Sequence, residues 1–151
     1  MASHPQTEWN TATWPANGEH VSETTVLAGS VLAAGRARGF VEKVLCPLHA
    51  RSALSAVTLA ASEMATQAVL GGRGPMTVTL SCQATAVTLS VTYTTDTATY
   101  DARLRMADEV AARIIEGISR ASGNDVVDGR QRMWCTIPTG FVQVPAQPGG
   151  R

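Results

Sequence analysis

The sequence predicts an α+β fold: a two-layer sandwich in which helices cover one face of a largely antiparallel mixed sheet. Three observations lead to this prediction. Apolar residues recur at helical spacing in three stretches, and polar and apolar residues alternate at residues 76–82 and 87–93. The expected elements follow the order strand, helix, helix, hairpin, helix, strand. Helices segregated to one face of an antiparallel sheet are a usual packing for such an order.

The first expected elements are a short strand at residues 24–27 and a helix over residues 31–45. In the helix, apolar residues recur at helical spacing while arginines, a glutamate and a lysine point outward. Pro47 is expected to end the helix, because proline cannot continue the backbone hydrogen-bond ladder.

A second helix is expected over residues 53–70, with Ser52 as its N-cap. Its apolar stripe comprises Leu54, Val57, Ala61, Met64, Ala65 and Ala68. Glu63 and Gln67 lie four residues apart on an adjoining face, so their side chains should project together. They are either a solvated face or part of a site. Glycines at 71, 72 and 74 and Pro75 then break the chain.

The alternating stretches at 76–82 and 87–93 are expected to pair as an antiparallel hairpin, followed by a polar loop over residues 94–101. A third helix is expected over residues 103–120. The segment Gly123, Asn124 and Asp125 predicts a turn before a short strand at residues 126–127. A final strand is expected at residues 133–137.

The expected domain spans residues 21–138, between a flexible arm at residues 1–20 and a flexible tail at residues 139–151. Trp9 and Trp14 stand out in the arm, either covering an edge of the domain's own core or binding a partner.

The composition excludes some classes of function. Twelve basic residues balance twelve acidic ones, and this zero net charge argues against binding to a nucleic-acid backbone. No uninterrupted apolar run suggests a membrane helix, and no secretory signal is evident. Cys46, Cys82 and Cys135 are odd in number and widely spaced, which is typical of reduced thiols in a cytoplasmic protein.

Residues 62–72 (SEMATQAVLGG) resemble the nucleotide-binding helix of the GHKL (histidine-kinase-like) ATPase superfamily, in the branch of bacterial anti-sigma-factor serine kinases. That helix reads roughly Glu-Leu-x-Thr-Asn-Ala-x-x-His-Gly. Residues 37–41 (ARGFV) are similar to the family's Ala-Arg-x-Phe-Val helix. Residues 129–138, which end in WCTIP, resemble its closing Gly-x-x-x-Trp-Phe-x-Leu-Pro strand. The resemblance covers about residues 24–138 and implies the histidine-kinase-like ATPase fold.

The resemblance assigns Glu63 to the position of the catalytic base that activates a protein serine, and Gln67 to the position of the Asn that binds Mg²⁺ on ATP. The chain departs from the family at three places. Gln replaces that Asn, Tyr93 or Thr94 stands where the adenine-binding Asp is expected, and residues 101–104 (DARL) replace the lid motif Gly-x-Gly-Leu. Asp96 is the candidate substitute on adenine.

Together these departures predict a pseudo-kinase that has lost ATP binding, carries no cofactor and regulates transcription by protein–protein interaction. The implied partners are a sigma factor or a STAS-type anti-anti-sigma protein, and a homodimer is expected. The alternative is an active ATP-dependent serine kinase, with Glu63 as base, Gln67 on Mg²⁺ and Asp96 on adenine. A third possibility is that the cleft binds another small ligand.

Overall fold

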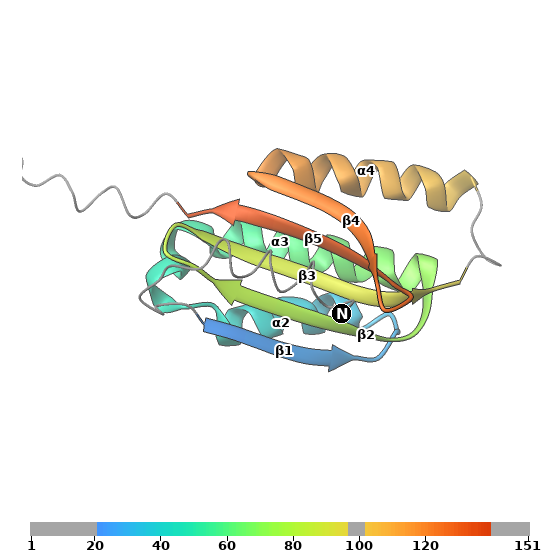
Figure 1. Cartoon of the computed structure of the whole chain (residues 1–151), viewed down its shortest axis with the longest axis horizontal. Helices are drawn as coiled ribbons and strands as arrows, with labels where there is room; N and C mark the ends of the chain where they lie inside the picture. The colour runs from blue at the N-terminus through green and yellow to red at the C-terminus, as the bar shows by residue number, and fades with distance from the viewer. Residues whose placement is uncertain (1–20, 97–101, 140–151) are drawn as a thin grey trace, which may run out of the picture.

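A computed structural model describes residues 21–96 and 102–139, and these residues form the predicted α+β sandwich. One layer is a five-stranded sheet and the other consists of helices on one face of it (Figure 1). The arm at residues 1–20, with Trp9 and Trp14, lies outside the described residues. So does the expected tail apart from Thr139.

The sheet has the order β1-β2-β3-β5-β4, and every described pairing is antiparallel. Its strands are β1 (Val21–Leu27), β2 (Gly72–Cys82), β3 (Ala86–Thr95), β4 (Ala121–Val127) and β5 (Arg130–Pro138). The predicted hairpin is β2–β3, in which Leu80 lies opposite Leu89. Among the described strands, β2, β3 and β5 are interior, so β1 and β4 are the edge strands available for pairing with another chain.

The three helices are α2 (Ala33–Val44), α3 (Pro47–Gly71) and α4 (Ala102–Ile118). Helix α3 lies across the middle of the sheet, α2 packs beside it over β1 and β2, and α4 packs on α3 and β4. Helix α4 therefore lies at the margin of the sheet, and only a narrow stripe of it is buried. Val110, which the sequence places on its inner face, is 50% exposed for this reason.

The start of α3 differs from the prediction. Cys46 is the N-cap and Pro47 occupies the first turn, so the helix begins six residues before Ala53. Proline suits this position because its missing N–H would have no partner in the first turn and its φ is already helical. Ser52 is an exposed residue within the helix and caps nothing. Pro47 thus starts one helix and does not merely end the other.

The core lies between α2, α3 and the inner face of the sheet. The apolar stripe predicted for α3 is confirmed, since Val57, Ala61, Met64, Ala65 and Ala68 are each at most 3% exposed. Small residues on this helix let its backbone lie close to the large side chains of the central strands. These include Met76, Leu80, Leu89 and Ile137, all fully buried.

The segment expected to form a turn at Gly123–Asp125 instead belongs to β4, and the turn lies at Asp128 and Gly129. Both of these residues have positive φ, 53° and 78°, as the two central residues of a tight hairpin turn require. Gly123 pairs with Trp134 on β5, and a Cβ at residue 123 would lie 3.1 Å from the indole. The glycine in the strand therefore makes room for the tryptophan.

Within α3, Ser52–Gly71 is long and apolar enough to cross a membrane by length and composition alone. In this fold the segment is the central core helix, whose apolar stripe packs on the sheet. This arrangement is compatible with a soluble protein. The three cysteines are free thiols: Cys82 and Cys135 are buried and Cys46 is partly buried.

Candidate functional site

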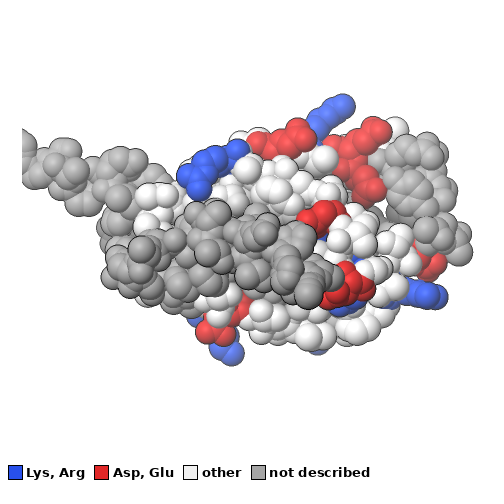
Figure 2. Space-filling view, viewed as in Figure 1, with Lys and Arg blue, Asp and Glu red and all other residues white. Residues whose placement is uncertain are grey.

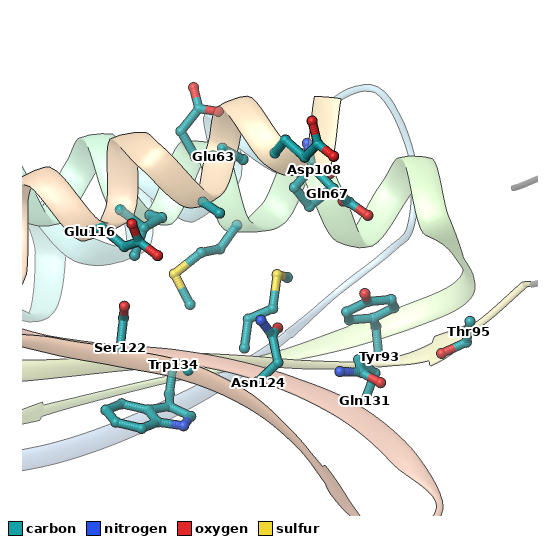
Figure 3. Close-up of a pocket in the computed structure, with 17 residues that line it drawn as sticks. Glu63, Gln67, Tyr93, Thr95, Asp108, Glu116, Ser122, Asn124, Gln131 and Trp134 are labelled. Atoms are coloured by element: carbon teal, nitrogen blue, oxygen red, sulfur yellow. The ribbon is translucent and has the colours of Figure 1, made fainter. Parts of the chain in front are cut away.

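A cleft of about 610 Å³ opens between α3, α4 and the inner face of the β3–β5–β4 part of the sheet. Figure 3 shows Glu63, Asp108 and Glu116 on its helix side, with Ser122, Asn124 and Gln131 on its sheet side. Its remaining lining residues are Met64, Gln67, Tyr93, Thr95, Glu109, Ala111, Ala112, Ile115, Gly123, Met133 and Trp134.

The structure brings together two of the three residues predicted for the site. Glu63 and Gln67, one helical turn apart on α3, both line the cleft. Gln67 is only 7% exposed, so it does not belong to a solvated helix face. Within the described part of the chain, no hydrogen bond reaches its side-chain amide.

Asp96, the third candidate, does not line the cleft. It follows the end of β3, where its backbone N–H donates a hydrogen bond to the carbonyl oxygen of Gly71 at 2.8 Å. This bond connects the end of β3 to the end of α3. Asp96 therefore occupies the junction between helix and strand, and Thr95 is the last residue of β3 that reaches the cleft.

Tyr93 and Thr94 are the two residues at which the family resemblance would put an adenine-binding Asp, and of these Tyr93 lines the cleft. Tyr93 comes from the inner face of β3, opposite Gln131 on β5, and its ring points toward the helices (Figure 3). Residues 101–104 stand where the resemblance would put the lid motif. Asp101 and the side chains of Ala102, Arg103 and Leu104 lie outside the described part of the structure.

The lining of the cleft is strongly acidic. Among its described lining residues, four are carboxylates, namely Glu63, Asp108, Glu109 and Glu116, and none is Lys, Arg or His. Basic side chains do occur elsewhere on the α4 side of the molecule (Figure 2), where Arg113 is exposed. The acid excess is therefore a property of the cleft rather than of the whole surface.

The polar side of the cleft formed by β4 and β5 was not found by sequence reasoning. The sequence pattern predicts a turn at Asn124, but this residue lies in β4 opposite Met133. A recognisable signal was present: Asp128-Gly129 is a strong hairpin-turn dipeptide, and placing the turn there extends a strand back through Asn124 and Ser122. Those two residues then share a face with the apolar residues of β5.

Cys135 lies beneath the cleft, where its Sγ is 4.0 Å from Sδ of Met64. Burial raises the pKa of the Cys135 thiol to about 12, and burial also raises the pKa of Cys82. A nucleophilic cysteine requires the thiolate, so these two thiols are structural rather than reactive. The described residues contain no group of three or more His, Cys, Asp or Glu arranged to hold a metal ion.

No protein-family model matches the chain, and no curated protein matches it significantly.

Proposed function

We propose that the protein is a regulatory protein-binding module of the anti-sigma-factor type, a pseudo-kinase that has lost ATP binding and acts in the cytoplasm through protein–protein interaction. The observation that carries this proposal is the charge of the cleft. Glu63 and Gln67 line it as the family resemblance implies, but three further carboxylates accompany them, and none of the described lining residues is basic. These described side chains would present the polyphosphate of ATP with negative charge.

Mg²⁺ bound to ATP does not fit this cleft. The oxygen donors of the cleft, which are its carboxylates and the amide of Gln67, are of the type that Mg²⁺ prefers. Nucleotide phosphates, however, also need Lys, Arg or a backbone N–H cradle beside the metal. The described lining of the cleft supplies neither a basic side chain nor a glycine-rich turn at a helix start. Tyr93 also offers no carboxylate for the adenine amino group.

The alternative is an active serine kinase, and one observation favours it. Glu63 and Gln67 share the cleft, as a base and a metal ligand would have to. The third member of that set, Asp96, lies outside the lining, which leaves adenine without its proposed carboxylate. We therefore rank the kinase second.

Exposed apolar side chains near the β1 edge support a protein-binding role. Val26 on β1 is 64% exposed, and Val31 and Leu32 before α2 are 93% and 54% exposed. These three residues, which we call the β1 patch, lie on the edge strand β1 or in the short connection that follows it. Apolar side chains at an open edge are a common site of strand addition or dimer formation. A sigma factor, a STAS-type protein or a second copy of this chain is the proposed partner.

Two measurements test the proposal. Millimolar Mg·ATP is expected to leave the thermal unfolding midpoint unchanged, whereas ligand at 100 times its Kd would stabilise the fold by about 2.7 kcal/mol. A clear shift that Gln67→Ala abolishes would favour the kinase instead.

The second measurement is calorimetric titration with purified sigma factors and STAS proteins from the source bacterium. We expect one of them to bind, and we expect the double variant Val31→Asp/Leu32→Asp to weaken that binding at least tenfold, about 1.4 kcal/mol. Val126→Asp is the matched control, because Val126 is 67% exposed on β4 at the opposite edge of the sheet. If no such protein binds, the proposed function is wrong.

A further inference from the structure

The face of the sheet that turns away from the helices carries a row of hydroxyl side chains, and the middle of this row is buried. The hydroxyl row runs across four strands, β1, β2, β3 and β5, and consists of Ser22, Ser81, Thr88 and Thr136. Ser22 is exposed, but the other three residues are only 1%, 2% and 4% exposed. An antiparallel sheet with helices on one side normally leaves such residues in water on the other. The hydroxyl row beyond β1 is therefore covered.

Long side chains on this face are buried as deeply as the short ones. Gln83, whose Nε2 donates to Oγ1 of Thr88 at 3.2 Å, is 2% exposed, and so is Arg132. On an open face these side chains would reach water, as glutamine and arginine mostly do. The three helices lie on the other side of the sheet (Figure 1), and no helix or strand in the described part of the chain lies on this side. The burial thus points to a covering segment beyond the described residues.

The chemistry of the hydroxyl row suits an apolar cover. Oγ1 of Thr88 lies 3.1 Å from Oγ1 of Thr136, and Oγ of Ser22 lies 3.2 Å from that of Ser81. Hydroxyl groups that are bonded to one another can be buried at little cost, and a threonine bonded in this way still offers its methyl group to a neighbour. Trp134, on the same face of β5, points away from the helices (Figure 3) and adds an aromatic surface.

Residues 1–20 join the sheet at one end of the hydroxyl row. Val21 is the first residue of β1, and the row begins at the next residue. Three strand spacings of about 4.8 Å separate β1 from β5, so about five extended residues suffice to cross the row. Trp14 and Trp9 precede Val21 by seven and twelve residues, which brings both within reach of its buried part. Residues 140–151 form a shorter segment, with Phe141 as its one aromatic residue.

We propose that residues 1–20 dock on this face of the sheet, with Trp9 and Trp14 packed over the hydroxyl row and beside Trp134. Tryptophan buries a large area and dominates the energy of such contacts. The two tryptophans are thereby assigned to the chain's own sheet and not to a partner protein. The docked arm covers the face opposite the cleft, and the proposal does not rest on the proposed regulatory function.

The test measures how far threonine methyl groups are shielded from a soluble gadolinium chelate, by NMR of the full chain. Thr88 and Thr136 report on the buried part of the hydroxyl row. Thr24, an exposed residue on the same face of β1, is the internal control. We expect weak relaxation enhancement at the first two methyl groups and strong enhancement at the third. Nuclear Overhauser contacts from the indole protons of Trp9 or Trp14 to the shielded methyl groups should accompany this pattern.

Two variants identify the covering segment. Trp9→Ala/Trp14→Ala is expected to raise the enhancement at Thr88 and Thr136 to the level of Thr24, because the arm loses the side chains that hold it. Phe141→Ala is the matched control in the segment after β5, and it should leave both methyl groups shielded. Circular dichroism checks that each variant folds.

The proposal is overturned if Thr88 and Thr136 are as accessible as Thr24 in the wild type. It is also overturned if they stay shielded in the double tryptophan variant, or if Phe141→Ala exposes them equally. Shielding that disappears on dilution would assign the cover to a second copy of the chain and would likewise refute the proposal. Should the double variant not fold, the absence of indole contacts to these methyl groups in the wild type decides against it.

Discussion

Gly72 lies directly against Tyr93, so closely that a Cβ at residue 72 would come within 2.5 Å of Cδ2 of the tyrosine ring. The same Cβ would lie 2.6 Å from the carbonyl oxygen of Ala68 and 2.7 Å from that of Thr94. Gly72 is also the residue at which α3 passes directly into β2. A glycine at this junction therefore lets the chain reverse against β3 while Tyr93 keeps its place in the cleft.

Gly72→Ala is expected to destabilise the domain by about 1–3 kcal/mol, the usual range for a side chain forced into a packed site. Two of the three close contacts are backbone carbonyl oxygens, which cannot move aside as a flexible side chain would. Urea unfolding followed by circular dichroism measures the loss.

Gly71→Ala is the matched control for this change. A Cβ at residue 71 would meet nothing within 4 Å, although the residue is the immediate neighbour of Gly72. We expect this substitution to be neutral or to stabilise the helix end by about 0.5–1 kcal/mol. Equal destabilisation by the two substitutions would show that the contact with Tyr93 is not the cause.

The ion pair between Arg132 and Asp125 joins β4 to β5 on the face of the sheet away from the helices. Nε of Arg132 donates to Oδ1 of Asp125 at 2.9 Å, and a second guanidinium nitrogen donates to Oδ2 at 2.5 Å. The arginine side chain is 3% exposed, whereas that of the aspartate is 38% exposed. Asp125→Ala leaves the buried guanidinium without its carboxylate. We expect a loss of about 1–3 kcal/mol, less than for a fully buried pair because water partly screens the aspartate.

A double-mutant cycle checks this expectation. Replacing both partners, with Asp125→Ala and Arg132→Met, also removes the buried guanidinium, so the double variant should be more stable than Asp125→Ala alone. Asp125→Ala, Arg132→Met, the double variant and the wild type are compared by urea unfolding. Additive losses in the cycle would mean that the two side chains contribute independently.

Much of the fold could be predicted because its signals are local and periodic. The strict alternation at 76–82 and 87–93 defines the inner faces of β2 and β3, and Leu80 and Leu89 indeed lie opposite each other in the core. The apolar stripe of α3 was equally clear. The start of α3 was misassigned because Pro47 is compatible with both the end of one helix and the beginning of the next.

Less of the site could be predicted, because it depends on which distant strands lie side by side. The spacing of Glu63 and Gln67 places both on one face of a helix, and both line the cleft. Nothing local indicates that Asp108 and Glu116 of α4, or Asn124 of β4, would line the same cleft from about 40 to 60 residues further along the sequence. Gly123 and Asn124 have low strand propensity, and only their pairing with β5 makes them part of a strand.

The turn at Asp128 and Gly129 gives a prediction about the β4–β5 hairpin. Gly129 has a φ of 78°, where a residue with a Cβ is strained. Gly129→Ala should therefore cost about 1 kcal/mol. Gly117→Ala, within α4 where a Cβ would meet nothing within 4 Å, should stabilise the fold by about 0.5–1 kcal/mol instead. Thermal unfolding of the two variants should give shifts of opposite sign, and shifts of the same sign would refute the argument from φ.

The Cys135 thiol gives a prediction about alkaline stability. Burial raises its pKa from an ordinary value of 9.0 to about 12. Above pH 9 the unfolded chain therefore releases a proton that the folded chain keeps, so this residue's contribution to stability falls as the pH rises from 9 to 12. By pH 10 the loss from this one group is about 1.4 kcal/mol.

Other groups also titrate in this range, so the variant Cys135→Ala provides the comparison: it removes the thiol and with it this part of the pH dependence. The free energy of unfolding in urea should fall between pH 8 and pH 10 by about that much more in the wild type than in Cys135→Ala. An identical fall in both proteins would mean that Cys135 is accessible to solvent, contrary to its 0% exposure between α3 and the sheet.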